Sequence, residues 1–197
     1  MELVQRVGRL FDDSLAVQSA TRDALAPDLA RAVEVLTATL LEGGKILVCG
    51  NGGSAAQAQH FACELIDCYE TERQELAAIN LCADTTLLTA IGNNHGQAQL
   101  FAKQINALGQ AGDLLVVLST SGNSESVIEA IHAAHRHELR VIALTGASGG
   151  RLAAILGDSD LLLAVPDDRT PRVQEAHQLM LHCLCDGVDA LLLGLET

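Results

Sequence analysis

Apolar residues along this chain alternate between short continuous runs and longer stretches with helical spacing. Five apolar runs end in glycine, serine or other turn residues and predict buried strands over 45–50, 77–82, 113–119, 140–146 and 161–166. Helical periodicity predicts helices over 2–24, 28–42, 54–67, 97–109, 124–138 and 172–193. The first two helices are expected to be separate, because the pattern breaks near Ala26 and Pro27.

Strands that are apolar throughout and alternate with helices are typical of a parallel sheet covered on both faces. Right-handed crossovers would make this sheet doubly wound, of the flavodoxin-like type. We therefore expect one α/β domain over 1–197 with a five-stranded parallel sheet. Extra N-terminal helices occupy 1–43, the α/β core 44–170 and a long C-terminal helix 171–197. The N-terminal helices precede the first strand, so their apolar faces are expected to pack on the sheet edge or on another subunit.

The composition and charge of the chain exclude several classes of protein function. The 197 residues suffice for one domain with a sizeable core. Twenty-five acidic residues against 12 basic ones give a formal charge of −13, which repels phosphodiester backbones, so direct nucleic-acid binding is not expected. No segment approaches the length of a membrane span, and the charged, helical start differs from a signal peptide, which favours a cytoplasmic protein. The six cysteines form no CxxC pair and are expected to be reduced, buried thiols.

The loop after the third strand concentrates hydroxyl groups, because Ser119, Thr120, Ser121 and Ser124 lie between a strand and a helix. A helix start offers unpaired backbone N–H groups and a partial positive charge, and small residues let the backbone approach an anion closely. A plain helix cap would need only one hydroxyl, such as that of Ser124. The four hydroxyls with a glycine favour a phosphate site built without Lys or Arg.

A second loop opens the first crossover helix with Asn51, Gly52, Gly53 and Ser54. It lacks both the GxGxxG spacing of dinucleotide sites and the GK[ST] of a P-loop. Taken alone, this loop could equally be a tight strand-to-helix turn with no ligand. Both loops follow strands at their carboxyl ends, where ligands of doubly wound sheets bind, so we expect them to share a ligand.

Polar residues on two of the predicted helices are candidates for a metal site or for acid–base catalysis. His60 and Glu64 are four apart and share a helix face, and Gln174 and His182 lie two turns apart along one side of the last helix. Together they could hold a divalent metal such as zinc, or Glu64 and His182 could act as an acid–base pair for aldose–ketose isomerisation. A surface hydrogen bond for the first pair and a satisfied core histidine for the second remain alternatives.

Longer stretches of sequence carry a family resemblance. KILVCGNGGSAAQAQHFACEL, LLTAIGN, GDLLVVLSTSGNS, VIALTG and RVQEAHQLMLHCLCD occur in the order found in the single-domain sugar isomerase (SIS) family. The whole chain resembles this family, and within it the phosphoheptose isomerases. The resemblance implies conversion of sedoheptulose 7-phosphate to D-glycero-D-manno-heptose 7-phosphate, a precursor of lipopolysaccharide heptose. It also implies a homotetramer with active sites at subunit interfaces, one probable zinc ion per subunit and no nucleotide cofactor.

The resemblance also implies roles for particular residues. Glu64 is the expected general base and His182 the expected acid. The implied metal ligands are His60, Glu64, Gln174 and His182. The implied substrate contacts are Asn51, Gly52, Gly53, Ser54, Glu64, Asn93, Asn94, Ser119, Thr120, Ser121, Ser124 and Gln174. His177 is a candidate outer-shell group.

The sequence departs from the family pattern at two positions. Asn94 stands where the family usually has Asp, and an amide cannot act as a base. Cys68 stands where an Arg often precedes the aromatic residue, and a thiol supplies no positive charge.

A relative with another role shares the fold. The segment YETER, the first helices and the HCLCD ending also resemble the DnaA initiator-associating class, which binds a replication initiator protein. Retention of Glu64 and His182 favours an enzyme. A DnaA-type partner, or a sugar-phosphate-binding protein without turnover, remains the alternative.

Overall fold

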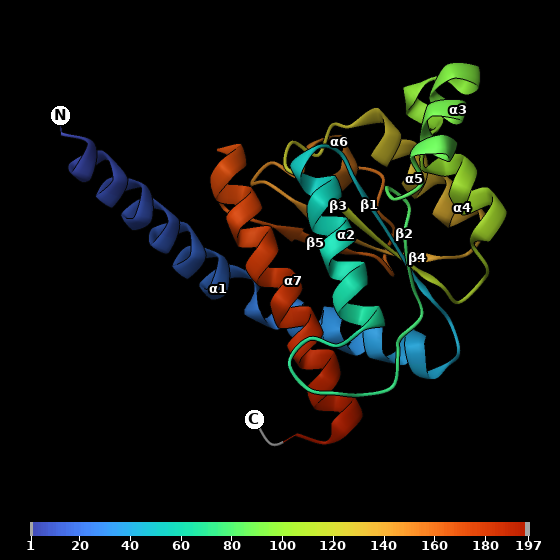
Figure 1. Ribbon diagram of the computed structural model, residues 1–197, viewed down its shortest axis with the longest axis horizontal. Coiled ribbons are helices and arrows are strands. Elements are labelled where there is room, and N and C mark those ends of the chain that lie inside the picture. Colours follow the sequence, from blue (N-terminus) through green and yellow to red (C-terminus); the bar gives the residue numbers. More distant parts are fainter. Residues whose placement is uncertain (1, 196–197) are drawn as a thin grey trace.

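The computed structural model describes residues 2–195 as an α/β domain with a five-stranded, all-parallel sheet (Figure 1). The strand order is β2-β1-β3-β4-β5, the flavodoxin-like order, which confirms the predicted fold class. The strands are β1 (Ile46–Gly50), β2 (Ala78–Asn80), β3 (Leu114–Ser119), β4 (Arg140–Thr145) and β5 (Leu161–Ala164). All five predicted strands are present, and each is one to three residues shorter in total than predicted.

Helices cover both faces of the sheet. The longer helices are α1 (Leu3–Leu41), α2 (Gly53–Ile66), α3 (Thr85–His95), α5 (Glu125–Arg136) and α7 (Thr170–Leu193). The shorter ones are η1 (Gln97–Gln99), α4 (Ala102–Leu108) and α6 (Gly150–Ala153). Alternate strand residues face the two layers: Val116 packs with α1, α2 and α7, and Val117 with α4 and α5. No helix of the described residues is long and apolar enough to span a membrane.

The N-terminal region differs from expectation. Instead of two helices, α1 is one helix of 39 residues with Pro27 inside it. Proline lacks the N–H for one intrahelical bond and crowds the preceding turn, which accounts for the bend midway along α1 in Figure 1. The half after the bend packs on a sheet face beside α7, with Leu36 fully buried, so the expected placement at the sheet edge is wrong for this half.

The other half of α1 extends away from the body of the domain (Figure 1). Up to Leu15 its large apolar side chains are exposed, including Leu3 at 78%, Val4 at 79% and Phe11 at 68%. Such a continuous apolar face is characteristic of a protein–protein contact.

Two helices were not predicted. The side chain of Asp84 caps α3 by accepting a hydrogen bond from the Leu87 N–H at 2.9 Å, a start signal present in the sequence. The single turn α6 is too short for periodicity to reveal. The predicted helix over 97–109 is divided into η1 and α4.

Candidate active site

The loop 119–124, here called the serine loop, joins β3 to α5. Ser124 is the N-cap residue, yet its side chain makes no capping hydrogen bond; its Oγ accepts one from Asn51 Nδ2 at 2.7 Å instead. The Ser124 side chain therefore does not cap the start of α5, where the Val127 N–H is bonded to the Ser124 carbonyl oxygen at 3.1 Å. Backbone position is fixed by Gly122, which has φ +63°, because a Cβ there would lie 2.1 Å from the Gly149 carbonyl oxygen.

The loop 50–54, here called the glycine loop, lies beside the serine loop at the point where strand order reverses between β1 and β3. Asn51 joins the two, because its Nδ2 also donates to Ser126 Oγ at 3.0 Å. The Gln174 side chain lies directly against Gly53, since a Cβ there would lie 2.5 Å from Gln174 Nε2. A pocket of about 240 Å³ opens here, lined by Asn51, Gln97, Ala98, Leu100, Ser124, Glu125 and Ser126. The two loops predicted at strand ends therefore lie side by side.

Side chains of α2 and α7 contact each other at a second place, beyond the glycine loop. His60 Nε2 lies 3.1 Å from His182 Nε2, and the two rings are in edge-to-face contact with centroids 5.3 Å apart. Glu64 Oε1 lies 3.5 Å from His60 Nδ1. Glu64 is 19% exposed and His60 40% exposed, so both remain accessible. Here the group of His60, Glu64 and His182 is called the imidazole cluster.

Two glutamines complete the contact between α2 and α7. Gln178 Nε2 lies 2.8 Å from His182 Nε2, and Gln57 Nε2 donates to the Gln174 carbonyl oxygen at 2.7 Å. Sequence reasoning missed Gln57 and Gln178, although the spacing of four through Gln174, Gln178 and His182 marks a polar stripe on α7. The Gln174 side chain itself lies against Gly53, at the glycine loop rather than in the imidazole cluster.

The donor chemistry of the imidazole cluster suits zinc. Two nitrogens bound tetrahedrally at 2.0–2.1 Å would stand about 3.3 Å apart, close to the 3.1 Å between the two Nε2 atoms. The Glu64 carboxylate lies 3.5 Å from Nδ1, the other nitrogen of the His60 ring. Within residues 2–195, however, no three His, Cys, Asp or Glu side chains are already arranged to hold a metal ion. The structure thus presents two imidazoles at ligand spacing with a carboxylate alongside.

Asn93 and Asn94 lie elsewhere, exposed on α3, where Asn93 Nδ2 donates to Asn94 Oδ1 at 3.0 Å. The hydrogen bonds of the described residues do not join them to the loops or to the imidazole cluster. Cys68 is half-buried in the segment after α2, next to Tyr69. The ring of Tyr69 lies 5.5 Å from that of His182, a neighbour that the sequence did not single out.

His177 is fully buried on α7. Its Nε2 lies 3.1 Å from the Thr145 carbonyl oxygen at the end of β4, and its Nδ1 has no partner among the described residues. Burial lowers the pKa of His177 from 6.5 to about 4, so the ring is neutral and donates its Nε2–H to Thr145. This contact ties α7 to the end of the sheet that carries the two loops, away from the imidazole cluster.

The six cysteines are free, as expected, but their burial varies. Cys49 and Cys185 are buried, whereas Cys63 and Cys183 are exposed, so the expectation of buried thiols is wrong for the latter two. Burial, followed by the nearby Glu64 carboxylate, raises the pKa of Cys185 to about 12. Cys185 therefore stays protonated beneath the cluster.

A doubly wound sheet whose glycine and serine loops meet at the switch point, beside ionisable side chains from flanking helices, defines a ligand-binding α/β domain. The family model described as "SIS domain" matches residues 10–146, and the chain belongs to this family. Within the family, its full-length relatives are phosphoheptose isomerases. The phosphoheptose isomerase of Dechloromonas aromatica (strain RCB) is 55% identical over 196 residues, covering 100% of both chains.

Solved structures agree. The phosphoheptose isomerase of Neisseria gonorrhoeae is 49% identical and superposes with a TM-score of 0.92, over 96% of this chain and 100% of that one. A phosphoheptose isomerase from Francisella tularensis is 42% identical with a TM-score of 0.91, over 96% and 99% of the two chains.

Proposed function

We propose that the protein is an aldose–ketose isomerase that converts sedoheptulose 7-phosphate to D-glycero-D-manno-heptose 7-phosphate. Full-length similarity to phosphoheptose isomerases carries the proposal. It gains support from the serine loop and the glycine loop, which meet at the switch point of the sheet, and from the imidazole cluster between α2 and α7. The product would enter lipopolysaccharide heptose synthesis in the cytoplasm.

The serine loop would hold the phosphate. The hydroxyls of Ser119, Thr120, Ser121 and Ser124 and the uncapped N–H groups of α5 would donate hydrogen bonds to it. Asn51, Gly52, Gly53 and Ser54 would line the sugar chain, with Gln174 over Gly53. Seven residues along α2 separate Gly53 from His60, which is about 10 Å of helix rise. A phosphorylated sugar chain can extend over that distance from the loops toward the cluster.

The imidazole cluster would carry out the proton transfers. Glu64 would remove a proton from one of C1 and C2 and return it to the other, through an enediolate. His182 would give and accept the protons of the neighbouring oxygens. Tyr69 and Gln178, which contact the His182 ring, would hold that ring in place. Asn93 and Asn94 would approach the sugar only if α3 of this or another subunit faces the site.

A zinc ion would suit this arrangement. His60, Glu64, Gln174 and His182 would hold it, and it would supply Lewis-acid stabilisation of negative charge on the substrate oxygens. Gln174 must then turn from Gly53 toward the histidines.

A homotetramer would cover the apolar surface of α1. The exposed face that includes Leu3 and Phe11 is one part of this surface. A cavity of about 570 Å³ between α1 and α7 is another, with a mainly apolar lining that includes Leu15, Leu29, Val33, Ala176, Leu179 and Met180. It is larger than the pocket at the loops but lacks converging catalytic groups, so further copies of the chain fit it better than a substrate. Light scattering at micromolar concentration should give four chains for the native protein and fewer for Leu179→Glu.

The activity itself is tested by NMR of sedoheptulose 7-phosphate incubated with pure protein and zinc. We expect the aldose signals to appear, and their absence would contradict the enzyme. The relatives reported above are phosphoheptose isomerases, so we favour this function over the DnaA-type scaffold. A pull-down with the host initiator protein tests that alternative.

A further inference from the structure

Arg73 lies in the segment between α2 and β2 and is almost completely buried, with its side chain 2% exposed. Its Nη2 donates to the Glu64 carbonyl oxygen at 2.8 Å, and its Nη1 donates to the Leu65 carbonyl oxygen at 2.9 Å. Its Nε donates to Asp189 Oδ1 on α7. One guanidinium therefore joins the end of α2 to α7.

Each of these contacts meets a physical need. The last carbonyl groups of a helix lack intrahelical partners, and α2 has no basic residue in its own last turn. Arg73 supplies a donor to each of these two carbonyls from outside the helix, and the Leu65 carbonyl also accepts from the Leu76 N–H at 3.1 Å. Asp189 is 5% exposed, and its Oδ2 has no hydrogen-bond partner among residues 2–195, so Arg73 supplies its counter-charge.

The pair acts on the two helices that carry the imidazole cluster. Glu64, whose carbonyl accepts from Arg73, is four residues after His60 on α2. Asp189 is seven residues after His182 on α7, about two turns along the same side. Figure 1 shows the segment after α2 looping across α7 before it returns to β2, and this segment also carries Tyr69 against His182.

We propose that Arg73, paired with Asp189, is a positioning residue that sets how α2 and α7 approach each other and thereby places Glu64 relative to His182. Its catalytic consequence rests on the proposed isomerase function; its geometric consequence for the two histidines does not. Arg73 is not expected to touch the substrate, because its donors are directed to backbone carbonyl oxygens and to the Asp189 carboxylate.

Two conservative variants test this. Arg73→Lys keeps the positive charge but loses the planar fork that reaches several acceptors at once, and Asp189→Asn removes only the counter-charge. The matched control is Asp113→Asn, which breaks another buried ion pair, since Asp113 is 4% exposed and lies 2.6 Å from Lys45 Nζ. That pair stands before β1 and β3, at the other end of the strands from the two loops.

Both Arg73→Lys and Asp189→Asn should lower kcat by about 10- to 100-fold, the usual cost of altering groups that orient active residues. KM for the sugar phosphate should stay unchanged, because the serine loop that would hold the phosphate is not moved. The imidazole ¹⁵N signals of His60 and His182, recorded without substrate, should shift in both variants and stay in place in Asp113→Asn.

The inference is overturned if kcat and the imidazole signals do not change, if KM rises in step with the loss of kcat, or if Asp113→Asn loses as much activity. It is also overturned if circular dichroism shows that neither variant folds while the control does, because the pair would then serve stability alone. If the native protein converts no heptose phosphate, the proposed function fails and the ¹⁵N signals decide the geometric claim.

Discussion

The serine loop takes its polar groups from six consecutive residues, whereas the imidazole cluster joins His60 and His182 across 122 positions of sequence. The end of β3 and the start of α5 give the loop its position, and a contact between Gly122 and the more distant Gly149 holds its backbone. The cluster exists only because α2 and α7 pack together. The two regions should therefore respond differently to substitution: the loop through substrate affinity, and the cluster through the rate of the chemical step.

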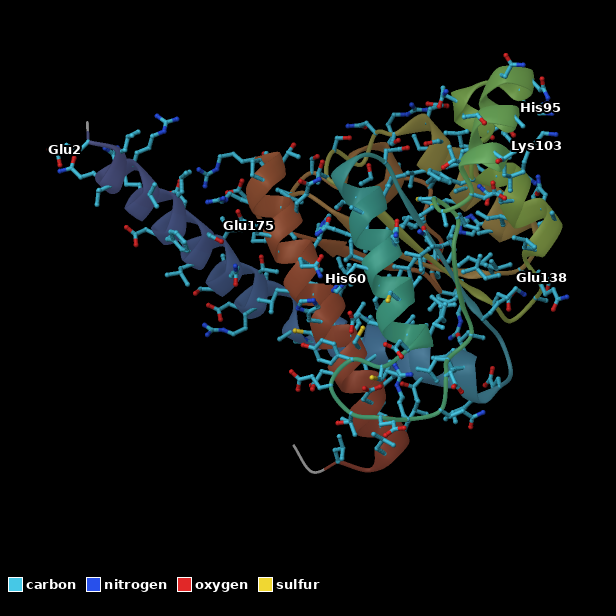
Figure 2. The ribbon with its side chains drawn as sticks, in the orientation of Figure 1. Glu2, His60, His95, Lys103, Glu138 and Glu175 are labelled. Atoms are coloured by element: carbon cyan, nitrogen blue, oxygen red, sulfur yellow. The ribbon has the colours of Figure 1, made fainter. Side chains whose placement is uncertain are left out.

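The largest effect is expected for Glu64→Gln. Removing the proposed general base while keeping the side-chain shape should lower kcat by about 10²- to 10⁴-fold, with little change in KM. Steady-state kinetics measure both constants. Glu138→Gln is the control, since Glu138 lies well away from His60 in Figure 2 and should retain full activity. Retained activity of Glu64→Gln would remove Glu64 from the base role.

A second effect concerns His177, which links α7 to the loop end of the sheet. Its pKa of about 4 is below the 6.5 of an exposed histidine, so the unfolded chain binds more protons between these pH values. The free energy of unfolding should fall as the pH drops through that window, by about 3 kcal/mol in full. His177→Gln should remove this part of the slope in urea titrations at several pH values.

The control for that experiment is His95→Gln, on the exposed α3 (Figure 2), which should keep the native slope. If His177→Gln has the same pH dependence as the native protein, the buried, neutral state of His177 is wrong.

The smallest effect is expected in the serine loop. Ser121→Ala removes one of several donors to the proposed phosphate, and a hydrogen bond to a charged group contributes about 1.5 kcal/mol or somewhat more. KM should rise about tenfold while kcat changes little. Ser159→Ala, before β5 at the other end of the sheet, should leave both constants as they are. A fall in kcat without a change in KM would place Ser121 in the chemistry instead.

Sequence patterns predicted the sheet well because its strands are apolar on both sides and end in recognisable turns. They failed at α1, where Pro27 predicts a break but the helix only bends, since packing of Leu36 and its neighbours against the sheet and α7 favours continuing the helix. They missed α3 although Asp84 marks its start. Of the candidate site residues, His60, Glu64 and His182 come together, whereas Asn93 and Asn94 stay apart in the single chain.

The chain's own order of residues determined the parallel sheet, the two loops at strand ends and the helix faces that carry His60 and His182. These features depend on neighbours within a few positions, through periodicity, turn geometry and helix termini. Only the tertiary structure decided that Tyr69 contacts His182, that Gln174 covers Gly53 and that Arg73 joins α2 to Asp189. Such contacts depend on how distant helices pack, which no local pattern specifies.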